Sequence, residues 1–172
     1  MQDLINECIT GNRKAQYKLY QQYAKAMYNT CYRIMNNAEE AEDILQEAFV
    51  SAFKNLASFK YESTFGAWLK RIVVNHAINS LRKRKLQLIS MSETNIEYES
   101  LENNQDVGNY TLSVAKIKKA MKELPEGYRV VFSLYLIEGY DHKEISEILG
   151  ITESTSKSQL NRAKSKLRAL MA

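Results

Sequence analysis

The stretch that decides the fold is YDHKEISEILGITESTSKSQLNRAKSKLRAL, residues 140–170. Asp141, followed three residues later by Glu144, is the pattern of a capped helix start. Gly150 predicts the end of that helix, because a residue without a Cβ atom enters a left-handed turn at little cost. Thr152 can then cap a second helix, so the stretch predicts a helix-turn-helix.

The second of these helices has two unlike sides when its residues are placed about 100° apart. Small and apolar side chains make one side: Ser156, Leu160, Ala163 and Leu167. Polar side chains without a carboxylate make the other: Lys157, Ser158, Asn161, Arg162 and Ser165. In a DNA major groove, Arg or Lys can reach guanine and Asn can reach adenine, so the pattern predicts a DNA-reading helix. An ordinary solvated helix face is the alternative.

Composition favours an all-α protein of one domain or two small ones. The chain has 172 residues, 45% of them hydrophobic, with only 6 Gly and 1 Pro, and it lacks alternating β-branched runs. We find no membrane-spanning run and no signal pattern, and therefore expect a cytoplasmic protein without membrane insertion. Cys8 and Cys31 lie among apolar helical positions, so we expect small buried residues and not a disulfide or metal pair.

Charge divides the chain into three segments. Residues 1–85 carry 13 Lys and Arg against 8 Asp and Glu, and residues 111–172 carry 11 against 7. Residues 86–110 carry 5 acidic residues and no Lys or Arg. We therefore predict two basic helical domains, 1–85 and 111–172, joined by a flexible acidic linker, 86–110.

Helical periodicity predicts a helix over 13–35, a turn at Asn36 and Asn37, and a second helix over about 39–56. The polar side of the second helix is acidic: Glu39, Glu40, Asp43, Gln46 and Glu47. Carboxylates in the first turn suit the helix dipole, but this patch runs past the first turn. A basic protein surface is thus a plausible partner for it, and DNA is not.

A polar loop over 57–64 precedes a third helix, about 65–84. We expect Leu69, Ile72, Val73 and His76 on its buried side, with His76 a core histidine. A line of aromatic, guanidinium and amide groups marks the other side: Trp68, Arg71, Asn75, Asn79 and Arg82. With Phe59, Lys60 and Tyr61 in the loop, it offers unpaired bases stacking, hydrogen bonds and positive charge.

The region after the linker predicts a helix over 111–123, a turn at 124–127 and a very apolar helix over 128–138. Taken together, the two halves resemble the extracytoplasmic function (ECF) sigma factors of bacterial RNA polymerase. AEEAEDILQEAFVSAFKNLASF and TFGAWLKRIVVNHAINSLRKRK are similar to sigma region 2. LPEGYRVVFSLYLIEGYDHKEISEILGITESTSKSQLNRAKSKL is similar to region 4.

The resemblance implies a protein that binds core RNA polymerase, recognises promoters, melts the −10 region and carries no catalysis, cofactor or metal. Asp43, Gln46 and Glu47 would dock on the clamp helices of the largest polymerase subunit. The loop with Phe59, Lys60 and Tyr61, and the line from Trp68 to Arg82, would bind the melted −10 strand. Lys157, Ser158, Asn161 and Arg162 would read the −35 duplex. An anti-sigma factor is the implied regulator.

The chain departs from the family at two positions, because Ser156 and Gln159 stand where a β-branched residue and an arginine are common. Two other function classes compete. A stand-alone helix-turn-helix regulator leaves the acidic helix side and the line from Trp68 unexplained, and it usually requires dimer symmetry. A nucleic-acid enzyme is disfavoured, because the sequence has no Gly-rich phosphate loop and no metal-ligand spacing.

Overall fold

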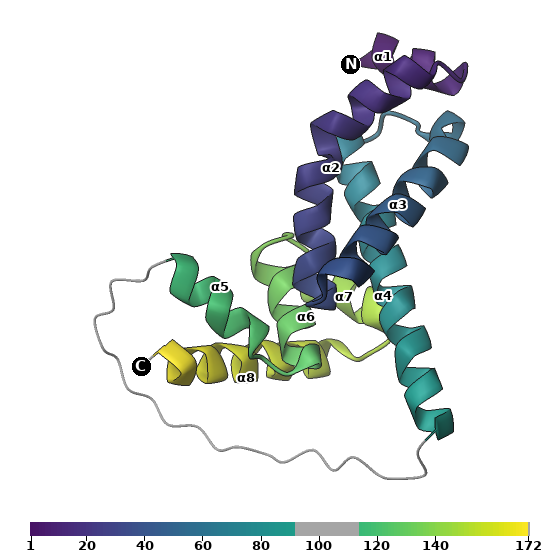
Figure 1. Ribbon diagram of the computed structural model, residues 1–172. Helices are drawn as coiled ribbons and strands as arrows, with labels where there is room; N and C mark the ends of the chain where they lie inside the picture. The colour runs from purple at the N-terminus through teal and green to yellow at the C-terminus, as the bar shows by residue number, and fades with distance from the viewer. Residues whose placement is uncertain (92–113, 172) are drawn as a thin grey trace. The chain divides into compact units, whose positions relative to one another are not determined.

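The computed structural model describes residues 1–91 and 114–171, and within them it contains helices and no strand. The chain divides into two compact units, Met1–Lys83 and Arg84–Ala172. Figure 1 shows the helices of each unit. They are α1 (Gln2–Ile9), α2 (Arg13–Met35), α3 (Ala38–Lys54), the short 3-10 helix η1 (Leu56–Ser58), α4 (Phe65–Met91), α5 (Val114–Lys122), α6 (Glu126–Leu136), α7 (His142–Leu149) and α8 (Glu153–Met171). The expected all-α architecture of two small domains is confirmed.

Asparagines set the helix boundaries of the N-terminal unit. The Asn12 side chain accepts hydrogen bonds from the backbone N–H groups of Lys14 and Ala15, which caps α2. Asn36 ends α2 in the left-handed conformation at φ 56°, and the Asn37 side chain then accepts from Glu40 N at 3.1 Å. The predicted turn at 36–37 is therefore confirmed, as is the helix over 13–35.

The N-terminal core forms where α2, α3 and α4 pack together. Its fully buried members include Leu19, Ile34, Leu69, Val73 and Val74. Burying a side chain of this size contributes about 1.5–3 kcal/mol relative to leaving it in water. The start of α4 lies close to α2, because a Cβ atom at Gly66 would come within 3.0 Å of the Tyr23 ring. This core holds the exposed faces of α3 and α4 in fixed positions.

In the C-terminal unit, α5, α6 and α7 pack with α8. The buried side chains come from every helix and include Met121, Val131, Leu134, Ile145 and Leu160. Leu136 and Ile137, which we assigned to an apolar helix, are 49% and 44% exposed at its C-terminal end. The core therefore uses the first part of α6 and leaves its end at the surface.

The helices differ from the prediction at several points. Helix α1 was not expected, and α4 continues to Met91, beyond the predicted linker start at residue 86. The rest of the linker, 92–110, and the expected helix start at 111 lie outside the described residues. Helix α6 begins at Glu126, so the turn predicted for 124–127 is shorter, because Pro125 is a favourable residue immediately before a helix.

Candidate nucleic-acid interface

The turn between α7 and α8 has the geometry that the sequence predicts. The Asp141 carboxylate accepts from Glu144 N at 2.7 Å, and the Glu144 carboxylate accepts from Asp141 N at 2.9 Å, which forms a reciprocal capping box. Gly150 ends α7 at φ 68°, a left-handed conformation that costs glycine little. The Thr152 hydroxyl accepts from Thr155 N at 3.0 Å and caps α8. All three predicted local signals are confirmed.

Helix α8 turns its polar side outward. Ser156, Leu160 and Ala163 are buried against the unit, as the periodicity predicts. The four expected −35 contacts are all exposed: Lys157, Ser158, Asn161 and Arg162. Lys157 Nζ lies 3.7 Å from Glu153 Oε2, one helical turn earlier, in an exposed ion pair that contributes little to stability. The helix thus presents donors of the kind that read base edges and phosphates.

Gln159 lies on a different side of α8 from these four residues. It is half-buried, and its amide faces the start of α6, where a Cβ atom at Gly127 would come within 3.3 Å of Gln159 Oε1. Gln159 therefore packs against the start of α6 within the C-terminal unit.

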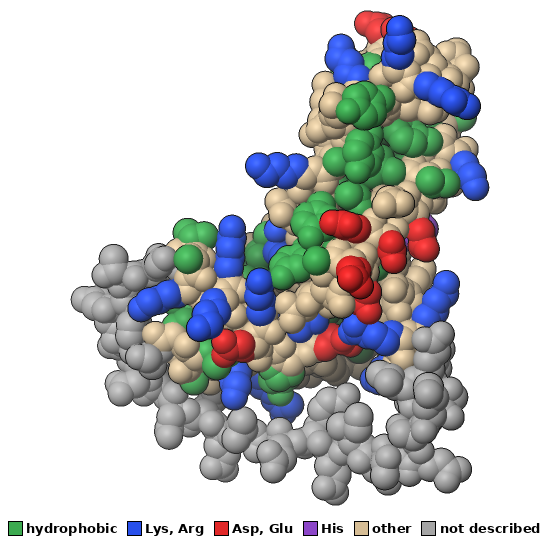
Figure 2. All heavy atoms as spheres, in the orientation of Figure 1, with side chains coloured by type: hydrophobic (Ala, Val, Ile, Leu, Met, Phe, Trp, Pro, Cys, Tyr) green, Lys and Arg blue, Asp and Glu red, His purple; other side chains and the backbone are tan. Residues whose placement is uncertain are grey.

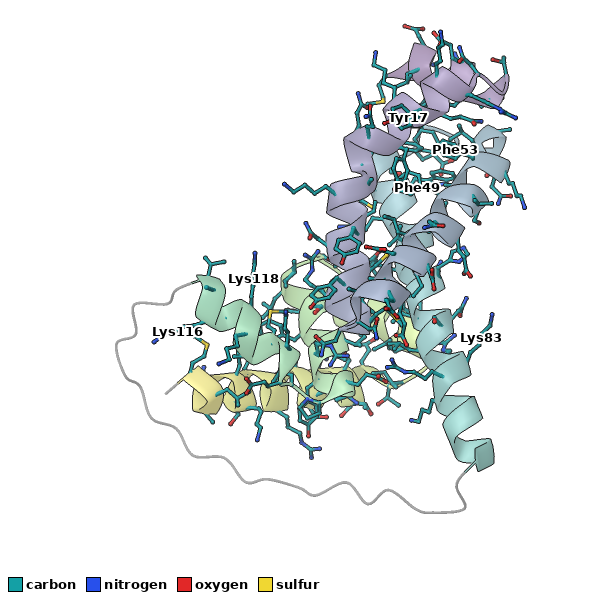
Figure 3. All side chains as sticks on the ribbon, viewed as in Figure 1. Tyr17, Phe49, Phe53, Lys83, Lys116 and Lys118 are labelled. Atoms are coloured by element: carbon teal, nitrogen blue, oxygen red, sulfur yellow. The ribbon has the colours of Figure 1, made fainter. Side chains whose placement is uncertain are left out.

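In the N-terminal unit, α4 carries the predicted polar line. Arg71, Asn75, Asn79 and Arg82 are exposed, and Lys83 follows them near the end of the unit (Figure 3). These residues recur every three or four positions, so they lie along one side of the helix. The line combines amide and guanidinium donors with no carboxylate among its members, which suits a nucleic-acid strand.

An aromatic cluster adjoins the start of this line. The Phe59 ring lies 4.6 Å from Tyr61, 5.8 Å from Phe65 and 5.4 Å from Trp68, measured between ring centroids. Phe59 is only 7% exposed and Trp68 is half-buried, whereas Tyr61 is 45% exposed and Lys60 is exposed. Contrary to our expectation of an open stacking surface, the ring of Phe59 lies inside the cluster, because neighbouring aromatic rings cover it. Tyr61 is the ring that the loop presents to solvent.

Tyr61 also has an unusual backbone. Its φ is 59°, in the left-handed region that non-glycine residues seldom occupy. Such a conformation costs about 1–2 kcal/mol for a residue with a Cβ atom. The loop accepts this cost and holds the Tyr61 ring against Phe59, so the exposed ring is placed before any ligand arrives.

The acidic side of α3 is open to solvent. Asp43, Gln46 and Glu47 are all exposed, and Figure 2 shows carboxylates gathered over the first half of α3. The expected buried side of α4 is correct for Leu69 and Val73 but wrong for Ile72 and His76, which are partly exposed. His76 is not a core histidine, because its Nδ1 lies 3.7 Å from Glu47 Oε2 at the edge of this acidic side.

A strip of hydrophobic side chains lies beside the acidic side, between α2 and α3 (Figures 2 and 3). Tyr17 is 62% exposed and Val50 is 52% exposed, and Phe53 is partly exposed next to the more buried Phe49. Exposed apolar strips of this kind on a small domain mark surfaces that bind other proteins.

Within residues 1–91 and 114–171, no group of His, Cys, Asp and Glu side chains is arranged to hold a metal ion. In the same ranges, no helix has the length and apolar content needed to cross a membrane. Cys8 and Cys31 are buried, as expected, and burial raises the pKa of the Cys8 thiol.

Two features of the site were not visible in the sequence. One is the left-handed backbone of Tyr61, for which no glycine or asparagine gives a signal. The other is a hydrogen bond between His142 Nδ1 and Ser156 Oγ, 2.9 Å long, inside the helix-turn-helix. The sequence marked Ser156 only as an unusual residue at an apolar position.

Family models and known proteins match both halves of the chain. The model described as Sigma-70 region 2 matches residues 19–87, and the model described as Sigma-70, region 4 matches residues 115–167. SigW of Bacillus subtilis, an ECF RNA polymerase sigma factor, is 33% identical over 95% of this chain and 92% of its own length. SigM of Mycobacterium tuberculosis, also an ECF sigma factor, is 27% identical over 98% of this chain and 83% of its own length.

Solved structures share the fold. The sigma factor RpoE of Bartonella quintana, in complex with the anti-sigma factor NepR, matches 90% of this chain and 95% of its own, with a TM-score of 0.59 and 24% identity. CnrH, in complex with the cytosolic domain of CnrY, matches 98% and 94%, with a TM-score of 0.55 and 23% identity.

Proposed function

The chain belongs to the ECF family of RNA polymerase sigma factors, and we propose that it divides promoter recognition between its two helical units. It is a sigma factor that acts with core RNA polymerase at promoter DNA, and not a stand-alone regulator. The assignment of the two promoter elements and of the polymerase to particular residues is our proposal. The observation that carries it is the outward polar face found on one helix of each unit, which has no carboxylate on α4 and none after Glu153 on α8.

The C-terminal unit reads the −35 element as duplex DNA. Helix α8 enters the major groove with four side chains: Lys157, Ser158, Asn161 and Arg162. Arg162 offers two donors, which suit guanine, and Asn161 offers a donor and an acceptor, which suit adenine. Lys157 and Ser158 contact phosphates and fix the register. Gln159 takes no part, because its side chain faces α6.

The N-terminal unit binds the melted −10 strand. The exposed Tyr61 ring stacks on an unpaired base, with Lys60 next to it in the loop. Phe59 packs between Tyr61 and Trp68, and these ring contacts support the loop. Extracting a base costs a few kcal/mol of stacking, which a preformed aromatic surface offsets. Arg71, Asn75, Asn79 and Arg82 then follow the strand along α4.

The acidic side of α3 docks on the polymerase. The exposed side chains on this side are Asp43, Gln46 and Glu47. Their carboxylates repel DNA phosphates, whereas a basic helical surface such as the clamp of the largest subunit complements their charge. The adjoining strip with Tyr17 and Val50 supplies apolar area for the same contact.

The remaining parts of the proposal follow from the family. We place the protein in the cytoplasm with the polymerase that it directs, and we assign the chemistry of RNA synthesis to the polymerase and none to this chain. An anti-sigma factor is the regulator we propose, as in the complex of RpoE with NepR.

DNA binding by the free chain tests the division of labour. We expect a promoter duplex to bind the isolated protein poorly and the assembled holoenzyme tightly, because strand capture in the N-terminal unit requires melted DNA. Labelled duplex and the same fragment with a premelted −10 region would be titrated in parallel. Tight, sequence-specific binding of the duplex by the chain alone would contradict the proposal and favour a helix-turn-helix regulator.

A further inference from the structure

A polar contact joins the two helices of the helix-turn-helix. The Nδ1 atom of His142, the first residue of α7, lies 2.9 Å from the Oγ atom of Ser156 on α8. Ser156 is fully buried, with 0% of its surface exposed. The imidazole ring of His142 stacks on the Tyr135 ring of α6, with centroids 4.4 Å apart and planes inclined by 22°.

This contact differs in kind from its surroundings. The other buried residues on this side of α8, Leu160 and Ala163, pack through apolar surface, and such packing has no preferred direction. A hydrogen bond weakens steeply when donor and acceptor lose alignment. Ser156 and His142 therefore resist rotation of α8 about its axis more strongly than the apolar contacts do.

Rotation of α8 matters because Ser156 is followed directly by residues of the reading face. Lys157 and Ser158 are the next two residues, and neighbouring helix positions lie about 100° apart. A small turn of the helix would move each of their side chains sideways across the groove. Tyr135 holds the imidazole ring from the third helix, so the hydrogen-bonding partner of Ser156 is itself fixed.

We propose that His142 and Ser156 form a positioning pair that sets the rotation of the recognition helix and thereby the choice among −35 sequences. The pair does not touch DNA in this account; it acts through Lys157, Ser158, Asn161 and Arg162. The inference rests on the proposed −35 function of α8. It gives a role to Ser156, a polar residue at a position that is commonly apolar in the family.

The test measures −35 discrimination by holoenzyme, assembled from core RNA polymerase and the full chain. Run-off transcription on the preferred promoter is compared with transcription on a set of −35 substitutions, for the wild type, Ser156→Val, His142→Leu and the double variant. Contacting residues usually couple, so we expect each single variant to reduce the discrimination ratio about threefold or more, and the double variant to lose no more than either one.

Two controls separate positioning from stability. Ser156→Thr keeps the hydroxyl and should restore most of the ratio. Ser133→Ala removes another fully buried serine hydroxyl, on α6, which has no hydrogen-bond partner in the structure, and it should leave the ratio unchanged. Thermal unfolding of each variant is recorded alongside, since a purely structural effect would change the unfolding temperature and not the ratio. If Ser156→Val fails to fold, the discrimination ratios of His142→Leu and Ser156→Thr are compared. A lower ratio in His142→Leu would support the positioning pair, and equal ratios would overturn it.

The outcomes are distinct. Reduced ratios that do not add, with rescue by Ser156→Thr, would support the positioning pair. Unchanged ratios in Ser156→Val and His142→Leu, or losses that add in the double variant, would overturn it while leaving the proposed function intact. A wild-type holoenzyme that shows no −35 preference at all would overturn both the proposal for α8 and this inference.

Discussion

At the scale of single residues, Tyr61 carries the clearest conflict between stability and function. Its left-handed backbone is unfavourable for a residue with a Cβ atom, yet it holds an exposed ring on Phe59. Tyr61→Ala and Tyr61→Gly both remove the ring, but only glycine also relieves the backbone. We expect the free energy of unfolding of the glycine variant to be about 1 kcal/mol higher than that of the alanine variant. In an ordinary backbone conformation the alanine variant would be the more stable of the two.

Both Tyr61 variants should open promoters equally poorly, because both lack the stacking ring. Chemical denaturation measures the first effect, and permanganate reactivity of the −10 thymines measures the second. An alanine variant as stable as the glycine variant would show that Tyr61 is not strained. Normal opening in either variant would remove Tyr61 from the strand-binding surface.

Asn75 lies in the middle of the polar line of α4 and is exposed. We expect Asn75→Ala to impair promoter opening more than polymerase binding, because we propose that this line binds the melted strand and that the acidic side of α3 binds the polymerase. Open-complex formation and the Kd for core polymerase are the two readouts. The matched control is Asn29→Ala, which removes an exposed amide from α2. Equal losses of opening and of polymerase binding in Asn75→Ala would contradict the assignment.

Arg162 is the residue of α8 for which we propose a two-donor contact with a −35 base. We expect Arg162→Ala to weaken discrimination between −35 sequences by about 1–3 kcal/mol, the scale of one bidentate base contact. Arg168→Ala, an exposed arginine in the last turn of the same helix, should change affinity without changing the order of preferred sequences. A holoenzyme with Arg162→Ala that ranks altered −35 sequences like the wild type would refute the contact.

At the scale of elements, the proposed role of α3 in polymerase binding can be tested separately from DNA binding. Asp43→Asn combined with Glu47→Gln removes two exposed charges while keeping similar side-chain shapes. We expect binding of core polymerase to weaken about tenfold, equivalent to about 1.4 kcal/mol, and its salt dependence to become shallower. With polymerase in excess, −35 preference should be unchanged.

The control for this element is Asp3→Asn, which removes an exposed carboxylate from the first turn of α1, outside α3. Fluorescence anisotropy of labelled protein titrated with core polymerase gives the Kd in each case. The account of α3 would be contradicted if the double variant bound as tightly as the wild type, or if Asp3→Asn weakened binding to the same extent.

The elements also show what sequence reasoning captures. Local signals fixed by neighbouring residues were predicted correctly: the Asn36 and Asn37 turn, the Asp141 and Glu144 capping box, and Gly150. Long periodic stretches such as Arg13–Met35 were also found. Short α1 and the extension of α4 to Met91 were missed, since neither has a strong boundary signal.

Tertiary contacts account for the other differences. The burial of Phe59, the exposure of His76 and the pairing of His142 with Ser156 depend on which helices come together in space. Helical periodicity alone places a residue on one side of a helix. It does not show how much of the helix surface the neighbouring helices bury. On α4 the buried side extends to Val74 and Ala77, which moves His76 to its edge.

At the scale of the whole molecule, each unit has its own core and its own polar face. The N-terminal unit combines the polar line of α4, an acidic side and an apolar strip, and the C-terminal unit carries α8, for which we propose duplex reading. Our proposal is that promoter specificity arises only when both units act on one DNA molecule, which the polymerase brings about. Linked weak sites of this kind bind far more tightly together than either does alone.

The most direct test of this central claim is run-off transcription by core RNA polymerase on a pool of promoter fragments from the source genome, with and without the purified protein. We predict discrete new transcripts whose start sites share −10 and −35 elements at a constant spacing. No new transcripts and no binding to core polymerase, together with tight binding of the protein alone to duplex DNA, would contradict the account.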